Sequence, residues 1–208
     1  MSTAFQDTLF GAADTAPALQ PLSSATRTHL DHGAWVDLRP GWLTGSAGLF
    51  DALLDGVAWR REQRQMYDRV VDVPRLVAHF TENDRLPEPL LVRMRDELSE
   101  HYRDELPGGF ATAGLCCYRD GSDSVAWHGD RFGRGAHTDT LVAIVSLGSP
   151  RTLHLRPRGG GTSLRFPLGS GDLLVMGGSC QRTWDHAVPK EKAGAPRISI
   201  QFRPTGVW

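Results

Sequence analysis

A histidine and an aspartate lie two positions apart in the segment SVAWHGDR, as His128 and Asp130 with Gly129 between them. The first half of this segment is typical of a β-strand, and residues i and i+2 of a strand point to the same side. An imidazole and a carboxylate placed in this way can bind one metal ion together, provided that a third ligand comes from elsewhere. The alternative is an ordinary turn, in which the glycine supplies backbone freedom and the aspartate a local cap.

The third ligand of such a site must be a histidine that another segment brings alongside. His101, His137 and His154 are candidates, but His186 has the most suitable context, because it follows an expected strand, DLLVMGG, and its glycine turn. Two imidazoles and one carboxylate on one face of an octahedron form the arrangement associated with non-haem Fe(II) oxygenases. A second His-x-Asp pair, His137 and Asp139, lies among glycines in an expected loop, where we expect a solvent-facing turn.

An arginine-containing strand is expected near the C-terminus. The run RISIQFR alternates strictly, so Arg197, Ser199, Gln201 and Arg203 share one face and the apolar residues share the other. In isolation this pattern is typical of a polar outer face with solvated arginines. Beside an iron site, a binding role for these arginines is favoured over a solvated face. An Fe(II) oxygenase needs a reductant with two carboxylates, and a guanidinium group binds a carboxylate through two parallel hydrogen bonds.

The elements that would position these residues are mostly strands. From residue 111 onward, seven or more short β-rich runs are separated by Gly, Ser, Asp and Pro turns, which is typical of a sandwich, barrel or jelly roll. Helical spacing of apolar residues occurs upstream, around residues 49–57 and 90–102. Residues 59–65 are an expected polar connector, and residues 1–30 show little periodicity. We therefore predict a loose N-terminal arm and a helical N-terminal half that packs onto one double-sheet β domain.

Composition argues against several classes of protein. The 208 residues carry a net charge of −1, which does not suit a protein that coats nucleic acid non-specifically. No apolar run approaches the roughly 20 residues of a membrane span, and the N-terminus lacks the pattern of a secretory signal. Three cysteines, two of them adjacent, make a poor disulfide framework. We expect a cytoplasmic, monomeric protein that does not bind membranes.

With these motifs in order, the sequence resembles the AlkB-like Fe(II)/2-oxoglutarate-dependent dioxygenases. The similarity runs through LCCYRDGSDSVAWHGD, IVSLGSPRTLHLR, LGSGDLLVMGGSCQRTWDHAVPK and PRISIQFRP, and it extends more loosely over residues 40–204. The resemblance implies a mainly β (α+β) fold with a double-stranded β-helix, or jelly-roll, core over residues 111–205. Residues 31–110 would form its helical, lid-forming part, so that residues 31–208 make one dioxygenase domain after a flexible arm at residues 1–30.

The resemblance also assigns roles to six residues. The iron ligands, which are the catalytic residues, would be His128, Asp130 and His186. The residues that bind the cosubstrate 2-oxoglutarate would be Tyr118, whose hydroxyl group hydrogen-bonds it, and Arg197 and Arg203, which hold its carboxylates. The cofactors implied are Fe(II), 2-oxoglutarate and O2.

Two positions depart from the family pattern. Cys116 stands where the family usually has an asparagine, and a thiol is a weaker hydrogen-bond donor than an amide. Arg131 and Phe132 stand where family members that act on alkylated bases commonly carry an acidic residue facing the target base. Phe132 could instead stack on a flipped base.

The implied activity is oxidative dealkylation of alkylated bases, such as N-methyl adenine or cytosine, in DNA or RNA, with release of succinate, CO2 and an aldehyde. The expected partner is alkylated nucleic acid, DNA in the first place, and a single strand would suit the modest net charge. Arginines that could bind its phosphates are Arg60, Arg61, Arg64, Arg151, Arg156 and Arg158.

Four further residues are candidates for contact with the substrate. Trp127 and Trp184 flank the ligands, and we expect core packing of both, with contact to the substrate as the alternative. Arg131 and Phe132 are the other two candidate substrate residues.

Two other functions stay open at this point. The missing acidic residue favours the same chemistry on a different substrate, as a 2-oxoglutarate-dependent hydroxylase or demethylase of a protein side chain or a small molecule. A β domain that has kept the shape but serves as a binding module is the third possibility, and the intact ligand set speaks against it.

Overall fold

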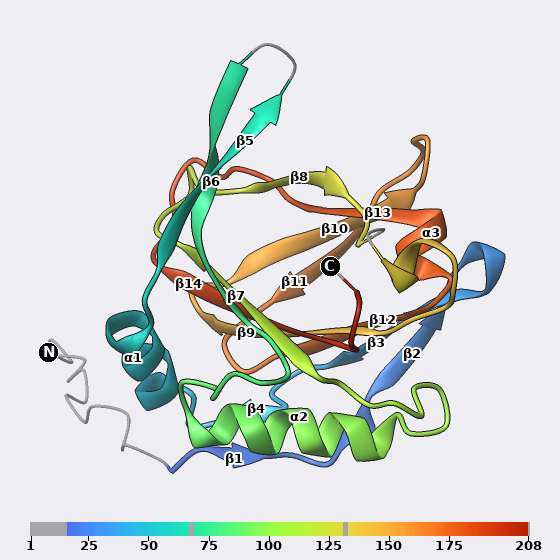
Figure 1. Cartoon of the computed structure of the whole chain (residues 1–208), viewed down its shortest axis with the longest axis horizontal. Coiled ribbons are helices and arrows are strands. Elements are labelled where there is room, and N and C mark those ends of the chain that lie inside the picture. Colours follow the sequence, from blue (N-terminus) through green and yellow to red (C-terminus); the bar gives the residue numbers. More distant parts are fainter. Residues whose placement is uncertain (1–15, 67–68, 131–132, 208) are drawn as a thin grey trace, which may run out of the picture.

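The computed structural model describes residues 16–66, 69–130 and 133–207 of the chain (Figure 1). Its strands are β1 (Ala18–Leu19), β2 (Thr26–His29), β3 (Ala34–Arg39), β4 (Leu43–Thr44), β5 (Arg60–Met66), β6 (Arg69–Phe80), β7 (Thr112–Tyr118), β8 (Val125–His128), β9 (Val142–Gly148), β10 (Arg151–Pro157), β11 (Leu164–Leu168), β12 (Leu173–Gly178), β13 (Trp184–Val188) and β14 (Arg197–Arg203). Its α-helices are α1 (Ala47–Gly56), α2 (Pro89–His101) and α3 (Cys180–Thr183), and its 3-10 helices are η1 (Leu22–Ser24), η2 (Asp31–Gly33) and η3 (Arg134–Ala136).

Two antiparallel sheets pack against each other in the middle of the molecule. Within the described residues, the larger sheet has eight strands in the order β2-β3-β12-β9-β14-β7-β6-β5, and the smaller has four in the order β11-β10-β13-β8. Both contribute to one apolar cluster, in which Ile144 of β9 and Met176 of β12 belong to the larger sheet and Leu155 of β10 and Val188 of β13 to the smaller. The prediction of a mainly β protein is confirmed, and the structure shows that its sheets are antiparallel.

The strands at the centre of the larger sheet are buried on both faces. On β9, Ile144 points toward the smaller sheet, whereas Val145 joins a second apolar cluster on the opposite face, in agreement with the period of two in a strand. On β14, Ile198 and Ile200 join that second cluster, and the arginine-bearing face points into the space between the sheets. The predicted alternation of β14 is therefore confirmed, and its polar face is covered by the smaller sheet rather than solvated.

Two helices cover the outer face of the larger sheet (Figure 1). Leu53 of α1 and the residues Leu91, Met94 and Leu98 of α2 are buried in the second cluster, which lies between the helices and the sheet. A proline at the first turn of α2, Pro89, suits a helix start because it has no backbone N–H to satisfy there. Both helices follow the apolar spacing in the sequence, and they cover the side of the sheet that faces away from the predicted ligands.

The N-terminal half is less helical than we predicted. Residues 16–30, expected to belong to a flexible arm, contain β1, η1 and β2, and β2 pairs with β3 at one edge of the larger sheet. Residues 59–65, expected to be a connector, lie mostly in β5, which pairs with β6 at the other edge. The expected lid-forming part at residues 31–110 thus supplies four strands besides two helices. Short edge strands bury few apolar side chains, so their backbone pairing leaves little trace in the sequence pattern.

No helix in the described ranges is long and apolar enough to cross a membrane.

Candidate active site

The three predicted metal ligands converge where β8 and β13 run side by side. Asp130 lies two residues beyond His128, the last residue of β8, and His128 stands opposite His186 in the register of the two strands. The two imidazole rings lie 4.2 Å apart between their centroids, and one ligand atom from each of the three residues lies within 4.8 Å of the others. Two imidazoles and a carboxylate at this spacing suit the facial coordination of Fe(II).

The hydrogen bonds and charges at this cluster favour the ionisation states that a metal needs. Nδ1 of His128 lies 2.9 Å from the carbonyl oxygen of Ala126. If the ring proton is on Nδ1 and is donated to that oxygen in a hydrogen bond, Nε2, which faces Asp130, carries the lone pair that a metal needs. Burial lowers the pKa of His128, which keeps the imidazole neutral at pH 7. Burial alone would raise the pKa of Asp130, but the charges of Arg203 and the two histidines hold it well below its usual range. A neutral imidazole and an ionised carboxylate are the metal-binding forms.

Two elements from elsewhere in the chain fix Asp130. Nε of Arg203 on β14 donates to Oδ2 of Asp130 at 2.7 Å, and both side chains are largely buried. The backbone N–H of Asp130 donates to Oε1 of Gln181 on α3 at 3.1 Å. The helical turn α3 stands where we expected a simple glycine turn before His186, so it contributes to the site through Gln181 as well as by leading the chain into β13.

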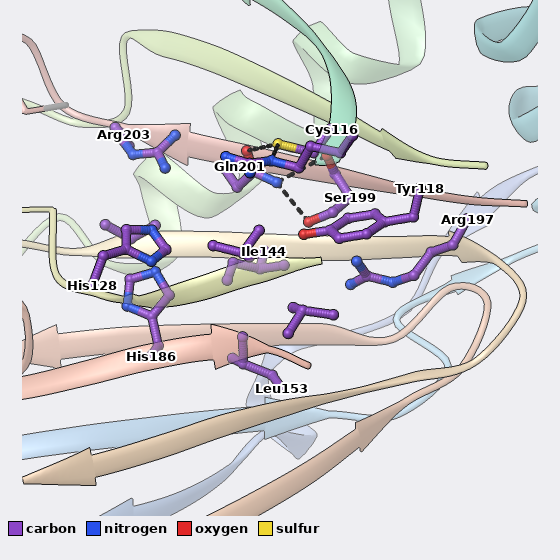
Figure 2. Close-up of a pocket in the computed structure, with 14 residues that line it drawn as sticks. Cys116, Tyr118, His128, Ile144, Leu153, His186, Arg197, Ser199, Gln201 and Arg203 are labelled. Carbon is purple, nitrogen blue, oxygen red and sulfur yellow. Dashed lines mark hydrogen bonds between the residues drawn. The ribbon is translucent and has the colours of Figure 1, made fainter. Parts of the chain in front are cut away.

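A pocket between the two sheets extends from the histidines to Arg197 (Figure 2). It encloses about 470 Å³, part of which is open to solvent. Its polar wall comes from β6, β7 and β14, and its apolar wall comes mainly from β9, β10 and β13. The residues of the polar wall are Arg75, Cys116, Tyr118, Arg197, Ser199, Gln201 and Arg203.

Arg197 lies at the far end of this pocket with hydrogen-bonding capacity to spare. The residue is 1% exposed, and its Nε donates to Oγ of Ser146 at 2.9 Å. Nη1 is buried and has no hydrogen-bond partner among the described residues. The guanidinium lies 5.0 Å from the ring centroid of Tyr118, and burial raises the pKa of that phenol to about 12, so it keeps its proton. A buried cation with an unused N–H beside a phenol donor is suited to bind an anion.

Arg75, Ser199 and Gln201 complete the pocket, and none of them was assigned to the site from the sequence. Nε of Arg75 donates to Sγ of Cys116 at 3.3 Å, and Nε2 of Gln201 donates to Oγ of Ser199 at 2.6 Å (Figure 2). The alternation of β14 already placed Ser199 and Gln201 on the arginine face, so this signal was present in the sequence. Arg75 carried no such signal, because nothing local shows that β6 lies beside β7.

The two tryptophans that flank the ligands do not line the pocket. Trp184 is buried in the apolar cluster between the sheets, and its Nε1 donates to the carbonyl oxygen of Asp31 at 3.3 Å. Trp127 lies on the outer face of the smaller sheet, where the guanidinium of Arg156 stands 4.1 Å from its ring centroid. These positions agree with packing, and contact of either tryptophan with the substrate stays untested.

Other expected residues also lie away from the pocket or beyond the described ranges. Arg151, a candidate for phosphate binding, is 2% exposed and donates to backbone oxygens, those of Asp123 and Pro189 among them, so it cannot meet a phosphate. The second His-x-Asp pair, His137 and Asp139, is exposed, and Asp139 is ion-paired with Arg182. Arg131 and Phe132, the remaining candidate substrate residues, lie outside the described residues.

Several characterised proteins are similar to this chain. The alpha-ketoglutarate-dependent dioxygenase alkB homolog 3 of Bos taurus is 30% identical over 81% of this chain and 65% of its own length. The human alkB homolog 3 is 29% identical over the same shares. The human DNA oxidative demethylase ALKBH2 is 32% identical over 55% of this chain and 46% of its own length. The chain thus spans less than two thirds of the length of these relatives.

A family-level match covers most of the chain. Residues 46–203 match the model of the 2OG-Fe(II) oxygenase superfamily. This range includes the His128, Asp130 and His186 cluster, which offers the nitrogen and oxygen ligands that Fe(II) requires. The chain therefore belongs to the 2OG-Fe(II) oxygenase superfamily, is AlkB-like in its relatives, and takes Fe(II), 2-oxoglutarate and O2.

Proposed function

We propose that this protein is a dioxygenase that removes alkyl groups oxidatively from bases in nucleic acid. One observation carries the proposal: the cluster of His128, Asp130 and His186 stands at one end of a pocket whose other end has a buried guanidinium N–H of Arg197 without a partner among the described residues. A metal ligand set and an anion site joined by one pocket suit a cosubstrate that chelates iron with one end and carries a carboxylate at the other.

In this proposal His128, Asp130 and His186 hold the iron, and Arg197 and Tyr118 hold the distal carboxylate of 2-oxoglutarate. Bound Fe(II) would supply the oxidation of an alkyl carbon by O2: 2-oxoglutarate would be converted to succinate and CO2, and an N-methyl base to the bare base and formaldehyde. Ser146 orients Arg197 through its Nε hydrogen bond. The apolar wall around Ile144 and Leu153 keeps water from the cosubstrate, and we propose that the two sheets that enclose the pocket are those of a jelly roll.

The nucleic-acid substrate is supported by the relatives and by the hairpin of β5 and β6. ALKBH2 is a DNA oxidative demethylase by name. The hairpin projects from the body of the protein (Figure 1), and it carries the exposed Arg60 and Arg61 on β5 and the pocket residue Arg75 on β6. We propose that its arginines hold a phosphate backbone beside the pocket. We propose further that the protein acts as a cytoplasmic monomer, that residues 31–208 form one domain to which β1 and β2 also belong, and that single-stranded DNA is the preferred partner.

The test is to incubate the full chain with Fe(II), ascorbate and 2-oxoglutarate, with an N-methylated oligonucleotide or its unmethylated counterpart, and to measure succinate and formaldehyde. The proposal predicts equimolar succinate and formaldehyde with the methylated strand, and neither product with D130A. Absence of succinate under every condition would contradict the dioxygenase assignment. Succinate formation that methylated DNA and RNA never stimulate would favour a protein side chain or a small molecule as the substrate.

A further inference from the structure

The three cysteines of this chain are all buried, and of the three only Cys116, which is 8% exposed, lines the pocket in the described part of the chain. Cys117 on β7 and Cys180 on α3 are 1% and 2% exposed and pack in apolar clusters. Burial raises the pKa of Cys117 to about 11 and that of Cys180 to about 12, so both thiols stay protonated. Cys116 precedes Cys117 on the same strand and therefore points to the opposite face, where its sulfur belongs to the wall of the pocket.

The surroundings of the Cys116 sulfur are strongly cationic. Nε of Arg75 donates to Sγ at 3.3 Å, and Arg197 and Arg203 line the same pocket. The described residues of the lining include no carboxylate. Sγ also donates to Oε1 of Gln201 at 3.6 Å, and a pocket lined by guanidinium groups draws anionic reagents toward the sulfur.

A second feature of the same pocket is a site suited to bind an anion. The buried Nη1 of Arg197 has no partner in the described part of the chain and lies in the pocket. In Figure 2, Cys116 lies along the pocket between the pair His128 and His186 at one end and Arg197 at the other. Cys116 and Arg197 therefore share the pocket that an anionic reagent would enter.

We propose that Cys116 is a covalent modification site for small electrophiles that carry a carboxylate. With a haloacetate, the thiolate sulfur attacks the methylene carbon, a carbon–sulfur bond forms, the carbon–halogen bond breaks, and halide leaves. The thiol proton goes to solvent, and nothing is oxidised or reduced. A carboxymethyl group on Cys116 occupies the space between the metal ligands and Arg197, so the modified protein cannot take up its cosubstrate. This last consequence rests on the proposed function, whereas the reactivity of the thiol does not.

The test uses the metal-free full chain, with iodoacetate and iodoacetamide as separate probes and peptide mass mapping as the readout. We expect one carboxymethyl group per chain, on Cys116, and none on the native C116S variant. We expect the ratio of the iodoacetate rate to the iodoacetamide rate to exceed that of glutathione by roughly tenfold, because a cationic cleft concentrates anions. R75M should lower this ratio, whereas R165M, which removes an exposed arginine on β11, should not.

Labelling of Cys117 or Cys180 at the rate of Cys116, or a ratio equal to that of glutathione, would overturn the assignment. Mn(II) with 2-oxoglutarate, without O2, should protect Cys116 from either reagent. Selective labelling that this mixture does not slow would still support the reactive thiol, and it would count against the proposed cosubstrate pocket, so the two failures are distinguishable.

Discussion

Arg203 and Asp130 form an ion pair, with 2.7 Å between Nε and Oδ2, that joins the arginine strand β14 to the cluster of predicted metal ligands. The resemblance implied that Arg203 and Arg197 both hold carboxylates of the cosubstrate. In the structure the carboxylate that Arg203 meets is Asp130, whereas Arg197 has an unused N–H in the pocket. We infer that Arg203 orients a metal ligand; that Arg197 and Arg203 hold carboxylates of the cosubstrate stays a prediction.

The first prediction concerns the pH dependence of stability. Asp130 has a folded-state pKa well below its usual range, so its pairing stabilises the fold above the unfolded-state pKa of about 3.9, and this stability is lost as the pH falls toward the folded-state pKa. In the metal-free protein, D130N should lower the free energy of unfolding by on the order of 2 kcal/mol at pH 7. The difference should shrink below about pH 4. Urea unfolding of the wild type and D130N from pH 7 to pH 3 measures this difference in the free energy of unfolding. A difference that does not change with pH would contradict the pairing of Asp130 with Arg203.

The second prediction concerns Arg197, the residue proposed to bind the distal carboxylate of 2-oxoglutarate. R197M should weaken 2-oxoglutarate binding by roughly 10- to 100-fold, which corresponds to the loss of about 1.5–3 kcal/mol from charge-assisted hydrogen bonds. R197K keeps the charge without the planar fork and should fall between R197M and the wild type. Titration of the Mn(II)-loaded protein without O2 gives the affinities, and circular dichroism checks that each variant folds. Wild-type affinity in a folded R197M would mean that the distal carboxylate binds elsewhere.

The third prediction concerns Cys116. Replacement of this residue by the asparagine usual in the family should lower the Kd for 2-oxoglutarate by roughly 2- to 10-fold, because an amide donates a neutral hydrogen bond worth about 0.5–1.5 kcal/mol where a thiol donates weakly. The amide oxygen can accept from Arg75 in place of the sulfur, so that hydrogen bond is kept. The same titration measures the change in Kd. C116S serves as a comparison, because the serine hydroxyl also donates a hydrogen bond but reaches less far than the asparagine amide. Weaker binding by C116N would show that the pocket has adapted to the thiol.

The fourth prediction concerns the hairpin. R60E/R61E changes two exposed residues of β5 and should weaken binding of a methylated single strand. The slope of the logarithm of the binding constant against the logarithm of the salt concentration should become shallower by about 0.7 for each phosphate that the variant no longer binds. R93E/R103E makes the same change of charge on and just after α2, on the side of the molecule away from the hairpin (Figure 1). Fluorescence anisotropy at several salt concentrations should show weaker binding for the first double variant alone. Equal weakening in both would indicate a response to net charge rather than a binding surface on the hairpin.

Local patterns in the sequence predict the chemistry well because that chemistry is placed on strands. The i, i+2 spacing of His128 and Asp130 and the alternation along β14 follow directly from the geometry of a strand. α2 has a full apolar face and a proline at its start, so it could be predicted as well. These features depend only on residues close to one another in the chain.

What could not be predicted depends on pairing between distant segments. Nothing local tells that His128 stands opposite His186 or that β6 brings Arg75 to Cys116. The polar β5 is a strand because its backbone pairs with β6, and its sequence gives little sign of that. Arg151 looks like a surface arginine in the sequence and is instead enclosed by backbone carbonyl groups.

The central claim is that His128, Asp130 and His186 form the metal site, and calorimetric titration of the metal-free protein with Mn(II), without O2, tests it most directly. We predict one bound ion per chain in the wild type and in H137A/D139A, which removes the rival His-x-Asp pair. We predict that H128A, D130A and H186A, each checked for folding, do not bind the ion. One equivalent of Mn(II) bound with unchanged affinity by folded D130A, or absence of binding in H137A/D139A, would contradict this claim.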